Sequence, residues 1–261
     1  MKVHESAVIE GNVEIPEDAE IGAFTVIEGN VKIGRGTKIG NRVTIKGNVT
    51  IGENCRIYDG AVIGEEPQHL KYAGEESSVE IGNRVVIREY VTVHRGTRFD
   101  KMKTVIKDEA MLMAYAHVAH DCVVGKGVIM ANCATLGGHV EVGDYAFIGG
   151  LSAVHQWARV GAYAMVGGLT GVSLDVPPFT VASGQHAKLY GINVVGLKRR
   201  GFPSEKIALL KKVYRLLFRS PLPLREAVKR VEQEYGDVPE VRMLLEFLRT
   251  TKRGIARDAG S

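Results

Sequence analysis

The sequence has few residues that could fix its structure covalently. It contains three cysteines, Cys55, Cys122 and Cys133, and no CxxC pair. An odd number of scattered cysteines predicts neither a disulfide framework nor a thiolate zinc site. It favours a reducing compartment.

Long apolar runs are also missing. No stretch approaches the roughly 18 consecutive apolar residues that a membrane-spanning helix needs. The first eleven residues, MKVHESAVIEG, have neither the basic part nor the apolar part of a signal peptide. We therefore expect a cytoplasmic protein without a transmembrane segment.

Net charge is small but unevenly distributed. Residues 192–261 hold 16 Lys/Arg and 8 Asp/Glu, which leaves 34 − 16 = 18 and 30 − 8 = 22 for the rest of the chain. The tail is thus +8 and the body −4. A basic tail favours an acidic partner, such as a phosphate, a nucleic acid or an acidic protein.

A six-residue repeat covers most of the chain. An aliphatic residue stands at every sixth position from Val3 to Ile63, at Ile81, Ile87 and Val93, and again from Ile106 to Val172, where Met130 fills one position. A small or β-branched residue follows four positions later. Two interior positions per six residues fit neither a helix nor a simple strand.

This period predicts a parallel β-solenoid with three short strands and three corners in each coil of 18 residues. Glycine often follows the aliphatic residue, as at Gly22, Gly125 and Gly143, which we interpret as a corner that needs an unusual backbone angle. The pattern resembles the hexapeptide-repeat acyltransferase superfamily. That resemblance implies a left-handed parallel β-helix and a homotrimer, neither of which the period itself shows.

The repeat ends at Pro177 and Pro178, after which the pattern becomes helical. Residues 206–219 form an amphipathic stripe, and two further helices are expected to reach about Tyr235 and Arg253. We predict a β-helix over residues 1–185, with inserted loops near 65–78 and 94–104. A helical domain over 186–261 would cover its end.

Several polar residues come into register when the coils are stacked. His120, Gly138 and Gln156 form one column, Asp121 lies beneath His139, and Gly137 lies beneath His155. Histidine is a natural general base for a hydroxyl or an amine, and a carboxylate can fix its tautomer. The hypothesis is therefore direct acyl transfer, with His120 as base, Asp121 orienting it and the Gly138 amide stabilising the oxyanion. Cys122 and Ser152 occupy inward repeat positions and are not expected to be nucleophiles.

Seven motifs carry a more specific resemblance: residues 70–75, 93–97, 116–122, 138–139, 153–156, 175–178 and 196–202. Together they resemble the UDP-N-acetylglucosamine O-acyltransferase family, which catalyses the first step of lipid A biosynthesis. The resemblance covers essentially the whole chain. It implies an acyl donor carried by acyl carrier protein, whose acidic surface suits the basic tail, and an acceptor that is UDP-N-acetylglucosamine or its 3-amino analogue.

The same resemblance implies the roles of further residues. The nucleotide sugar would be bound by Gln68, His69, Lys71, His117, His139, His155 and Gln156, and its uridine diphosphate end by Asn193, Arg199 and Arg200. The acyl chain would follow a groove near Gly168 and His186, in which side-chain bulk limits chain length. The site would lie between subunits, and no cofactor, metal or nucleic acid is expected.

Two positions depart from the family pattern. An aspartate is common where this chain has His69, near the acceptor group, so the new bond can be an ester or an amide. A glutamate is common near the uridine where this chain has Val195, whose apolar side chain lacks the carboxylate for that one contact.

Three other functions are compatible with parts of the sequence. A metal-dependent hydrase of the γ-carbonic anhydrase type uses the same prism, with zinc held between subunits by histidines, and His94, His117, His120 and His139 are candidates. A solenoid can also serve as a non-catalytic scaffold. A later N-acyltransferase of the same pathway would be expected to carry an extra N-terminal domain.

Overall fold

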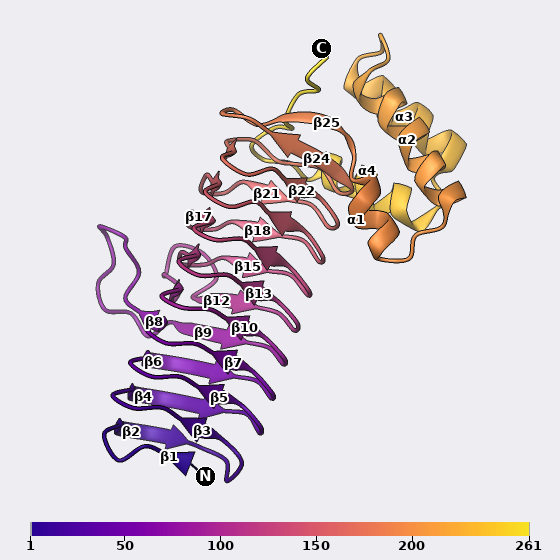
Figure 1. The fold of residues 1–261 in the computed structure, drawn as a ribbon. Helices are drawn as coiled ribbons and strands as arrows, with labels where there is room; N and C mark the ends of the chain where they lie inside the picture. The colour runs from indigo at the N-terminus through magenta and orange to yellow at the C-terminus, as the bar shows by residue number, and fades with distance from the viewer. Residues whose placement is uncertain (1, 261) are drawn as a thin grey trace.

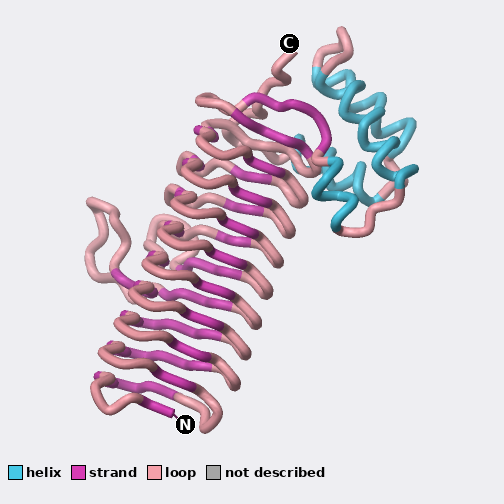
Figure 2. The backbone as a smooth tube through the Cα atoms, in the orientation of Figure 1, coloured by secondary structure: helices cyan, strands magenta, loops and turns pink. Residues whose placement is uncertain are grey.

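The structure is a computed structural model that describes residues 2–260 as an elongated prism of stacked coils (Figure 1). Figure 2 shows that the helices are confined to the C-terminal part, where they lie beside the last coils. Among residues 2–260, no helix is both long enough and apolar enough to cross a membrane.

Each coil contributes short strands to the faces of the prism. The first face consists of β1 (Lys2–Val3), β3 (Glu20–Ile21), β5 (Lys38–Ile39), β7 (Arg56–Ile57), β10 (Val86–Ile87), β13 (Met111–Leu112), β16 (Ile129–Met130), β19 (Phe147–Ile148), β22 (Met165–Val166) and β24 (Thr180–Ser183), and ends at β25 (Lys188–Ile192). The second face contains β8 (Val62–Glu65), β11 (Thr92–His94), β14 (His117–Val118), β17 (Thr135–Leu136), β20 (Ala153–Val154) and β23 (Gly171–Val172). The third face contains β9 (Ser78–Ile81), β12 (Lys103–Ile106), β15 (Val123–Val124), β18 (Glu141–Val142) and β21 (Arg159–Val160).

Three longer strands near the N-terminus run from the second face into the third: β2 (Val8–Glu14), β4 (Val26–Ile33) and β6 (Thr44–Ile51). The first half of β6 pairs with β8, and its second half pairs with β9. We name the edges of the prism the first–second, second–third and third–first corners, after the faces that they join.

Stacked strands pair in parallel, as predicted, and the usual offset is 18 residues, for example between His117 and Thr135. The offset grows to 30 residues between Val62 and Thr92 and to 25 between Thr92 and His117. These are the two predicted insertions, which occupy residues 66–77 and 95–102 between strands of the second and third faces. Both therefore leave the prism at the second–third corner.

Aliphatic side chains fill the prism. Ile27, Ile45 and Ile63 have no exposed surface, and the inward positions of Cys122 and Ser152 are confirmed by exposed fractions of 0% and 1%. Ile9 is 37% exposed, because a coil at the end of a solenoid has a neighbour on one side only.

The predicted reason for the repeated glycines is wrong. Gly22, Gly125 and Gly143 do not have a positive φ, whereas nearby non-glycine corner residues such as Phe24 (φ 56°) and Tyr145 (φ 60°) do. The cause is stacking: a Cβ on Gly125 would lie 2.6 Å from the backbone nitrogen of Asp144 in the next coil. Glycine is used here for close approach of two backbones rather than for a left-handed angle.

The last coil is closed by an antiparallel strand that the sequence did not predict. β25 turns back along β24, so the predicted boundary at residue 185 falls within the turn between them. The helices are α1 (Val194–Arg199), α2 (Ser204–Phe218), α3 (Leu224–Tyr235) and α4 (Pro239–Arg249). The last helix ends before the expected Arg253, because residues 250–260 return to the prism and pair with Asp175 and Leu189.

Candidate functional site

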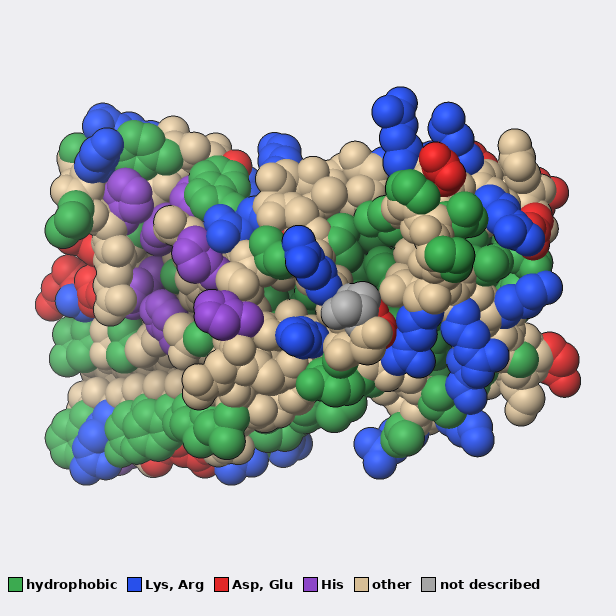
Figure 3. Space-filling model, turned by 90° about the horizontal axis from the view of Figure 1, so that it is seen from above, with side chains coloured by type: hydrophobic (Ala, Val, Ile, Leu, Met, Phe, Trp, Pro, Cys, Tyr) green, Lys and Arg blue, Asp and Glu red, His purple; other side chains and the backbone are tan. Residues whose placement is uncertain are grey.

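The second–third corner brings together the two insertions and the predicted column of polar residues. It contains residues 119–122, 137–140 and 155–158 of three successive coils, and the loop between β8 and β9 projects from the same edge (Figure 1). Figure 3 shows histidine side chains gathered on one part of the surface, apart from the lysines and arginines of the helical region.

His120 and Asp121 form a buried pair at this corner. Nδ1 of His120 lies 2.9 Å from Oδ2 of Asp121, and the exposed fractions of the two residues are 7% and 0%. Asp121 also accepts hydrogen bonds from the backbone N–H and the hydroxyl of Thr97, at 3.0 and 2.6 Å, and from the backbone N–H of Lys101 at 3.1 Å. The second insertion is thus attached to this carboxylate.

These contacts keep Asp121 ionised. Burial alone would raise the pKa of Asp121, but the hydrogen bonds from His120 and Thr97 outweigh burial and hold the pKa below its ordinary value. An ionised carboxylate fixes the His120 proton on Nδ1 and leaves the Nε2 lone pair available. Nε2 has no hydrogen-bond partner within residues 2–260.

Gly138 lies directly against the His120 ring. A Cβ on Gly138 would lie 2.6 Å from Nε2 of His120, so no side chain fits at this position. The Gly138 N–H donates to no acceptor within residues 2–260. An imidazole nitrogen without a partner and an amide N–H without a partner therefore belong to two residues in contact, the pair of groups that general-base catalysis with oxyanion stabilisation uses.

The ring of His139 lies next to the ring of His120. Its ring centroid is 4.8 Å from that of His120, and it stacks on Trp157 at 3.8 Å with an interplanar angle of 7°. Its Nδ1 is 3.1 Å from Oδ2 of Asp100, in the second insertion. Burial lowers the pKa of His139, although the hydrogen bond to Asp100 opposes this.

The first insertion adds His69, whose ring meets the His120 ring edge-on at 5.2 Å and packs against Phe99 at 5.0 Å. Arg95 holds this insertion in place by donating to the Gly64 carbonyl at 2.9 Å and to the Tyr72 hydroxyl at 2.8 Å. Gln68 and Lys71 lie exposed on the same loop, next to Leu70, whose side chain is fully exposed.

The other predicted histidines lie on the second face and at the second–third corner. His117 is 2.6 Å from the Thr92 hydroxyl through Nδ1, and its ring lies 5.0 Å from that of His94. Burial, followed by the nearby His117, lowers the pKa of His94 to about 4, and its Nδ1 is buried without a partner among the described residues. His155 and Gln156 are exposed at the corner.

The cluster has the composition of a metal site. Ligand atoms of His120, Asp121 and His139 lie within 4.8 Å of one another. The Asp121 oxygens, however, already accept three N–H or O–H groups besides His120, and the Lys101 ammonium lies 2.7 Å from Asp100. Saturated acceptors and a neighbouring cation favour an oriented imidazole over a bound metal ion.

Asn193, Arg199 and Arg200 lie elsewhere, at the third–first corner. They line a cavity of about 360 Å³ together with Tyr145 and Tyr163. Asn193 caps α1 by accepting from Gly196 N–H at 3.0 Å and donates to the Tyr163 carbonyl at 2.9 Å, so it also holds the helix on the prism. The Arg200 guanidinium lies 4.5 Å from the centroid of Tyr145. Within one chain, the structure does not bring these residues to His120.

Gly168 and His186 occupy a third location. Gly168 is exposed at the first–second corner, and a Cβ there would meet only the Gly150 carbonyl, at 3.3 Å. Gln185 pairs with Gly171 of the second face, which puts the exposed His186 at the end of that face.

The sequence did not identify four residues that shape the site: Thr97, Phe99, Asp100 and Trp157. Thr97 belongs to the motif at residues 93–97, but that motif implies no role for it. Trp157, the single tryptophan, lies 18 positions after His139, so the stacking rule that aligned His120 with Gly138 would have found it. Nothing in the repeat locates Phe99 or Asp100, because the insertion does not follow the period.

Comparison with known proteins identifies the family. A model for domain 2 of UDP N-acetylglucosamine O-acyltransferase matches residues 175–256, and a model for bacterial transferase hexapeptide repeats matches residues 30–65 and 103–138. An acyl-[acyl-carrier-protein]–UDP-N-acetylglucosamine O-acyltransferase of Aquifex aeolicus is 76% identical over 98% of each chain. A protein of the same name from Thermodesulfovibrio yellowstonii is 54% identical over 98% of this chain and 99% of its own length.

Solved structures agree with the sequence relatives. A UDP-N-acetylglucosamine O-acyltransferase from Moraxella catarrhalis is 38% identical, covers 98% of this chain and 100% of its own, and superposes with a TM-score of 0.95. The predicted left-handed parallel β-helix with a C-terminal helical domain is confirmed.

These relatives give no support to a metal-dependent hydrase or to a non-catalytic scaffold. Because proteins of one name match almost the full length of the chain at 76% and 54% identity, and share its fold, the chain belongs to the acyl-[acyl-carrier-protein]–UDP-N-acetylglucosamine O-acyltransferase family.

Proposed function

We propose that this protein transfers a 3-hydroxyacyl or related acyl chain from acyl carrier protein to the 3-position of UDP-N-acetylglucosamine or of its 3-amino analogue, the first step of lipid A biosynthesis. The names of the relatives support the two substrates. The observation that carries the proposal is the buried His120–Asp121 pair, whose imidazole ring packs against Gly138, a residue with an unpaired N–H.

The transfer proceeds without a covalent enzyme intermediate. His120 Nε2 takes the proton from the 3-hydroxyl or 3-amino group as the sugar oxygen or nitrogen bonds to the thioester carbonyl carbon. Negative charge on the carbonyl oxygen is accepted by the Gly138 N–H. The carbon–sulfur bond then breaks, and His120 returns the proton to the sulfur of the carrier. Cys122 takes no part, because burial raises its thiol pKa to about 12.

The remaining assigned residues bind the acceptor. Gln68, His69, Lys71, His117, His139, His155 and Gln156 contact the nucleotide sugar from the second face and the second–third corner. Asn193, Arg199 and Arg200 hold the uridine diphosphate, since a guanidinium donates two bonds to a phosphate. The residues assigned to the sugar and those assigned to the uridine diphosphate occupy different corners of one prism. The complete site therefore needs a second copy of the chain.

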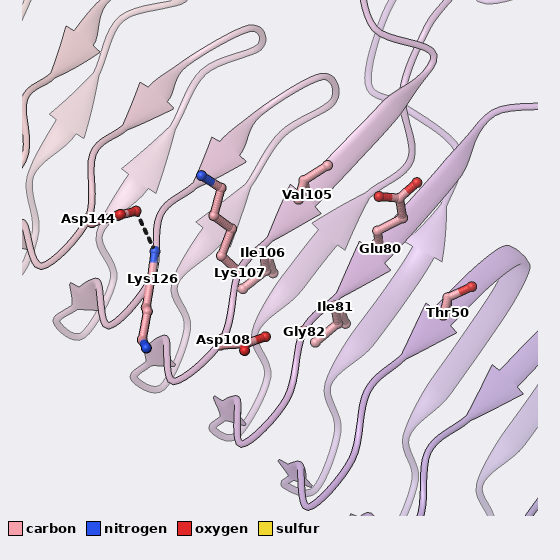
Figure 4. A pocket seen from close by; sticks show the side chains of 10 residues that line it. All are labelled: Thr50, Glu80, Ile81, Gly82, Val105, Ile106, Lys107, Asp108, Lys126 and Asp144. Carbon is pink, nitrogen blue, oxygen red and sulfur yellow. Dashed lines mark hydrogen bonds between the residues drawn. The ribbon is translucent and has the colours of Figure 1, made fainter.

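A homotrimer supplies that copy. Exposed apolar side chains line the first–second corner, namely Tyr90 (54%), Tyr115 (58%), Leu151 (64%) and Leu169 (67%). The adjoining first face directs Ile129, Phe147 and Met165 outward. The third face is charged instead: its Glu80 borders a shallow groove together with Lys107 and Lys126 of the adjoining third–first corner (Figure 4). An exposed apolar stripe of this length is typical of an interface.

Joining three copies along the apolar corner buries this stripe and leaves the charged third face in solvent. It also puts the second–third corner of one copy opposite the third–first corner of the next. The nucleotide sugar then spans the two subunits, and the acyl chain follows the groove near Gly168 and His186.

An acyl-transfer assay tests the proposal. Purified protein is given 3-hydroxyacyl carrier proteins of graded chain length with UDP-N-acetylglucosamine or its 3-amino analogue. We expect one of the two acceptors to be acylated. Mass spectrometry of the product decides whether the new bond is an ester or an amide, the choice that His69, near the acceptor group, leaves open. Absence of transfer to both acceptors at every chain length would contradict the proposal.

A further inference from the structure

The second–third corner contains two carboxylate–imidazole pairs rather than one. The Asp121–His120 pair has a separation of 2.9 Å, and the Asp100–His139 pair has a separation of 3.1 Å, each through Nδ1 of the histidine. The two rings are 4.8 Å apart and nearly perpendicular. The first pair serves the proposed reaction directly. In the second pair His139 is assigned to the acceptor sugar, whereas Asp100 has no assigned role.

His139 is held from several sides. Trp157 stacks on one face of its ring, and the residue is only 6% exposed. Its backbone N–H donates to the His120 carbonyl at 3.0 Å, and its φ of 65° lies in the left-handed region. Asp121 and Trp157, the equivalent residues of the coils on either side, have nearly the same angle (60° and 66°), so the corner itself fixes the backbone of His139. The ring therefore has one orientation, and Asp100 determines which nitrogen carries the proton.

Asp100 is itself held in place. Its carboxylate accepts from the Lys101 ammonium at 2.7 Å, and Lys101 also reaches the Asp121 carbonyl at 3.4 Å. The side chain of Asp100 is 23% exposed. Because the Lys101 backbone N–H also bonds to Asp121, one short insertion links the two histidine–carboxylate pairs.

The chemistry follows from the tautomer. A histidine that donates through Nδ1 to a carboxylate presents a lone pair at Nε2. Nε2 of His139 has no partner within residues 2–260, and it is not among the buried unpaired atoms of those residues, so a ligand can reach it. Such an atom accepts a hydrogen bond from an O–H or N–H group.

We propose that Asp100 is a positioning residue: by accepting the Nδ1 proton of His139, it presents the Nε2 lone pair of His139 to a hydroxyl or N–H group of the acceptor sugar, beside the base His120. This inference rests on the proposed function for the identity of the acceptor. The pairing of Asp100 with His139 does not depend on it, and the two can be tested separately.

Trp157 provides the first test. It is the single tryptophan of the chain, and a protonated imidazole stacked on indole quenches its fluorescence, so a pH titration of emission follows His139. The charged or titratable groups that face His139 are Asp100, Asp121 and His120. Loss of the carboxylate in Asp100→Asn is expected to move the midpoint of this titration to lower pH than in wild type, because the hydrogen bond to Asp100 favours the protonated ring.

Two variants of the full chain serve as controls. Glu141→Gln removes a carboxylate that also pairs with Lys101, at 3.4 Å, but has no hydrogen bond to His139, so its midpoint should match that of wild type. His139→Gln should abolish the titration. If Asp100→Asn titrates like wild type, Asp100 does not position His139, whether or not the protein transfers acyl groups.

Steady-state kinetics supply the second test. Asp100→Asn is expected to raise KM for the acceptor sugar about tenfold, as loss of one well-placed hydrogen bond does, with a smaller change in kcat, while Glu141→Gln leaves both unchanged. A shifted titration midpoint with unchanged KM and kcat would overturn the proposed contact between His139 and the acceptor. Failure of the wild type to transfer any acyl group would instead refute the proposed function.

Discussion

At the scale of single residues, the proposed catalysis depends on the charge of Asp121, the proton position on His120 and the absence of a side chain at Gly138. Asp121 can be both buried and ionised only because Thr97, Lys101 and His120 supply it with donors, since an unpaired buried carboxylate would take up a proton. Its charge fixes the proton on Nδ1 of His120, and the missing side chain of Gly138 leaves room for the ring. Each of these residues has a distinct physical task.

Replacement of the base gives the most direct prediction. His120→Ala should lower kcat by about 10²–10⁴, the usual contribution of a general base, and leave the oligomeric state as in wild type, with a lower unfolding midpoint because the buried Asp121 loses one donor. Thermal unfolding and light scattering provide the controls. Turnover near the wild-type rate would mean that another group takes the proton.

His94 predicts a pH dependence of stability. Its folded pKa is about 4, against about 6.5 in an unfolded chain. Between these values the unfolded chain binds a proton that the folded chain does not, so stability rises with pH across this window and is lost as the pH falls. The full loss at low pH is on the order of 3 kcal/mol.

The variant His94→Gln should therefore show a smaller fall in the urea unfolding midpoint between pH 7 and pH 4.5 than wild type. His4→Gln, at an exposed position near the N-terminus, is the matched control and should behave like wild type. Parallel pH profiles for wild type and His94→Gln would show that His94 does not titrate as its buried environment requires.

At the scale of the structural elements, the two insertions behave as one unit. Arg95 ties the first insertion to the second through Tyr72, and the Arg98 backbone N–H donates to Glu75 at 3.1 Å. His69 then rests on Phe99 and meets His120. The position of the substrate-binding loop is thus set by a residue outside it.

Arg95→Ala should release this loop. It removes donors to the Gly64 carbonyl and the Tyr72 hydroxyl, so we expect a loss of about 1–3 kcal/mol in stability and a higher KM for the acceptor sugar with a smaller change in kcat. Arg98→Ala is the control, because it keeps the backbone N–H that bonds to Glu75. Equal kinetic effects of the two substitutions would contradict the special role of Arg95.

The sequence predicted the elements that repeat and missed those that do not. The six-residue period located the coils, the inward Cys122 and Ser152, and the alignment of His120 with Gly138, because stacked backbones impose one spacing on every coil. It did not predict β25 or the return of residues 250–260, nor the pairing of Asp100 with His139. Those depend on contacts between segments far apart in the chain, which leave no periodic signal.

At the scale of the whole molecule, the acid–base residues and the basic residues assigned to the nucleotide occupy different corners of the prism. The acid–base residues lie at one corner of the prism, and the arginines assigned to the nucleotide lie at another, next to the basic helical region. A substrate that joins two corners must be shared between copies.

Arg200 provides a test of nucleotide binding. Its guanidinium lies over Tyr145 and lines the cavity at the third–first corner, so Arg200→Ala should raise KM for the nucleotide sugar much more than it lowers kcat. Lys198→Ala removes the same charge two residues earlier, within α1, but Lys198 does not line the cavity, so the KM of this variant should match that of wild type. An equal fall in kcat and kcat/KM for Arg200→Ala would assign it to the transition state instead.

Cys133 tests the arrangement of the trimer. It stands between Tyr115 and Leu151 in the apolar corner column, while Cys55 and Cys122 are buried. If three copies meet at this corner, a short bis-maleimide should link native chains through Cys133, and Cys133→Ser should prevent the link. A trimer by light scattering that forms no such link would contradict contact at this corner.

The closing segment of the chain has a consequence for self-association. A stack of parallel coils ends in unpaired backbone groups, which invite a second stack to continue it and build a filament. Here β25 reverses direction, and residues 257–259 then pair with Leu189 along its outer side. β25 and residues 257–259 thus cover the edge of the last coil at this end of the prism. A second molecule cannot add its coils there, so copies of the chain can associate side by side but not end to end.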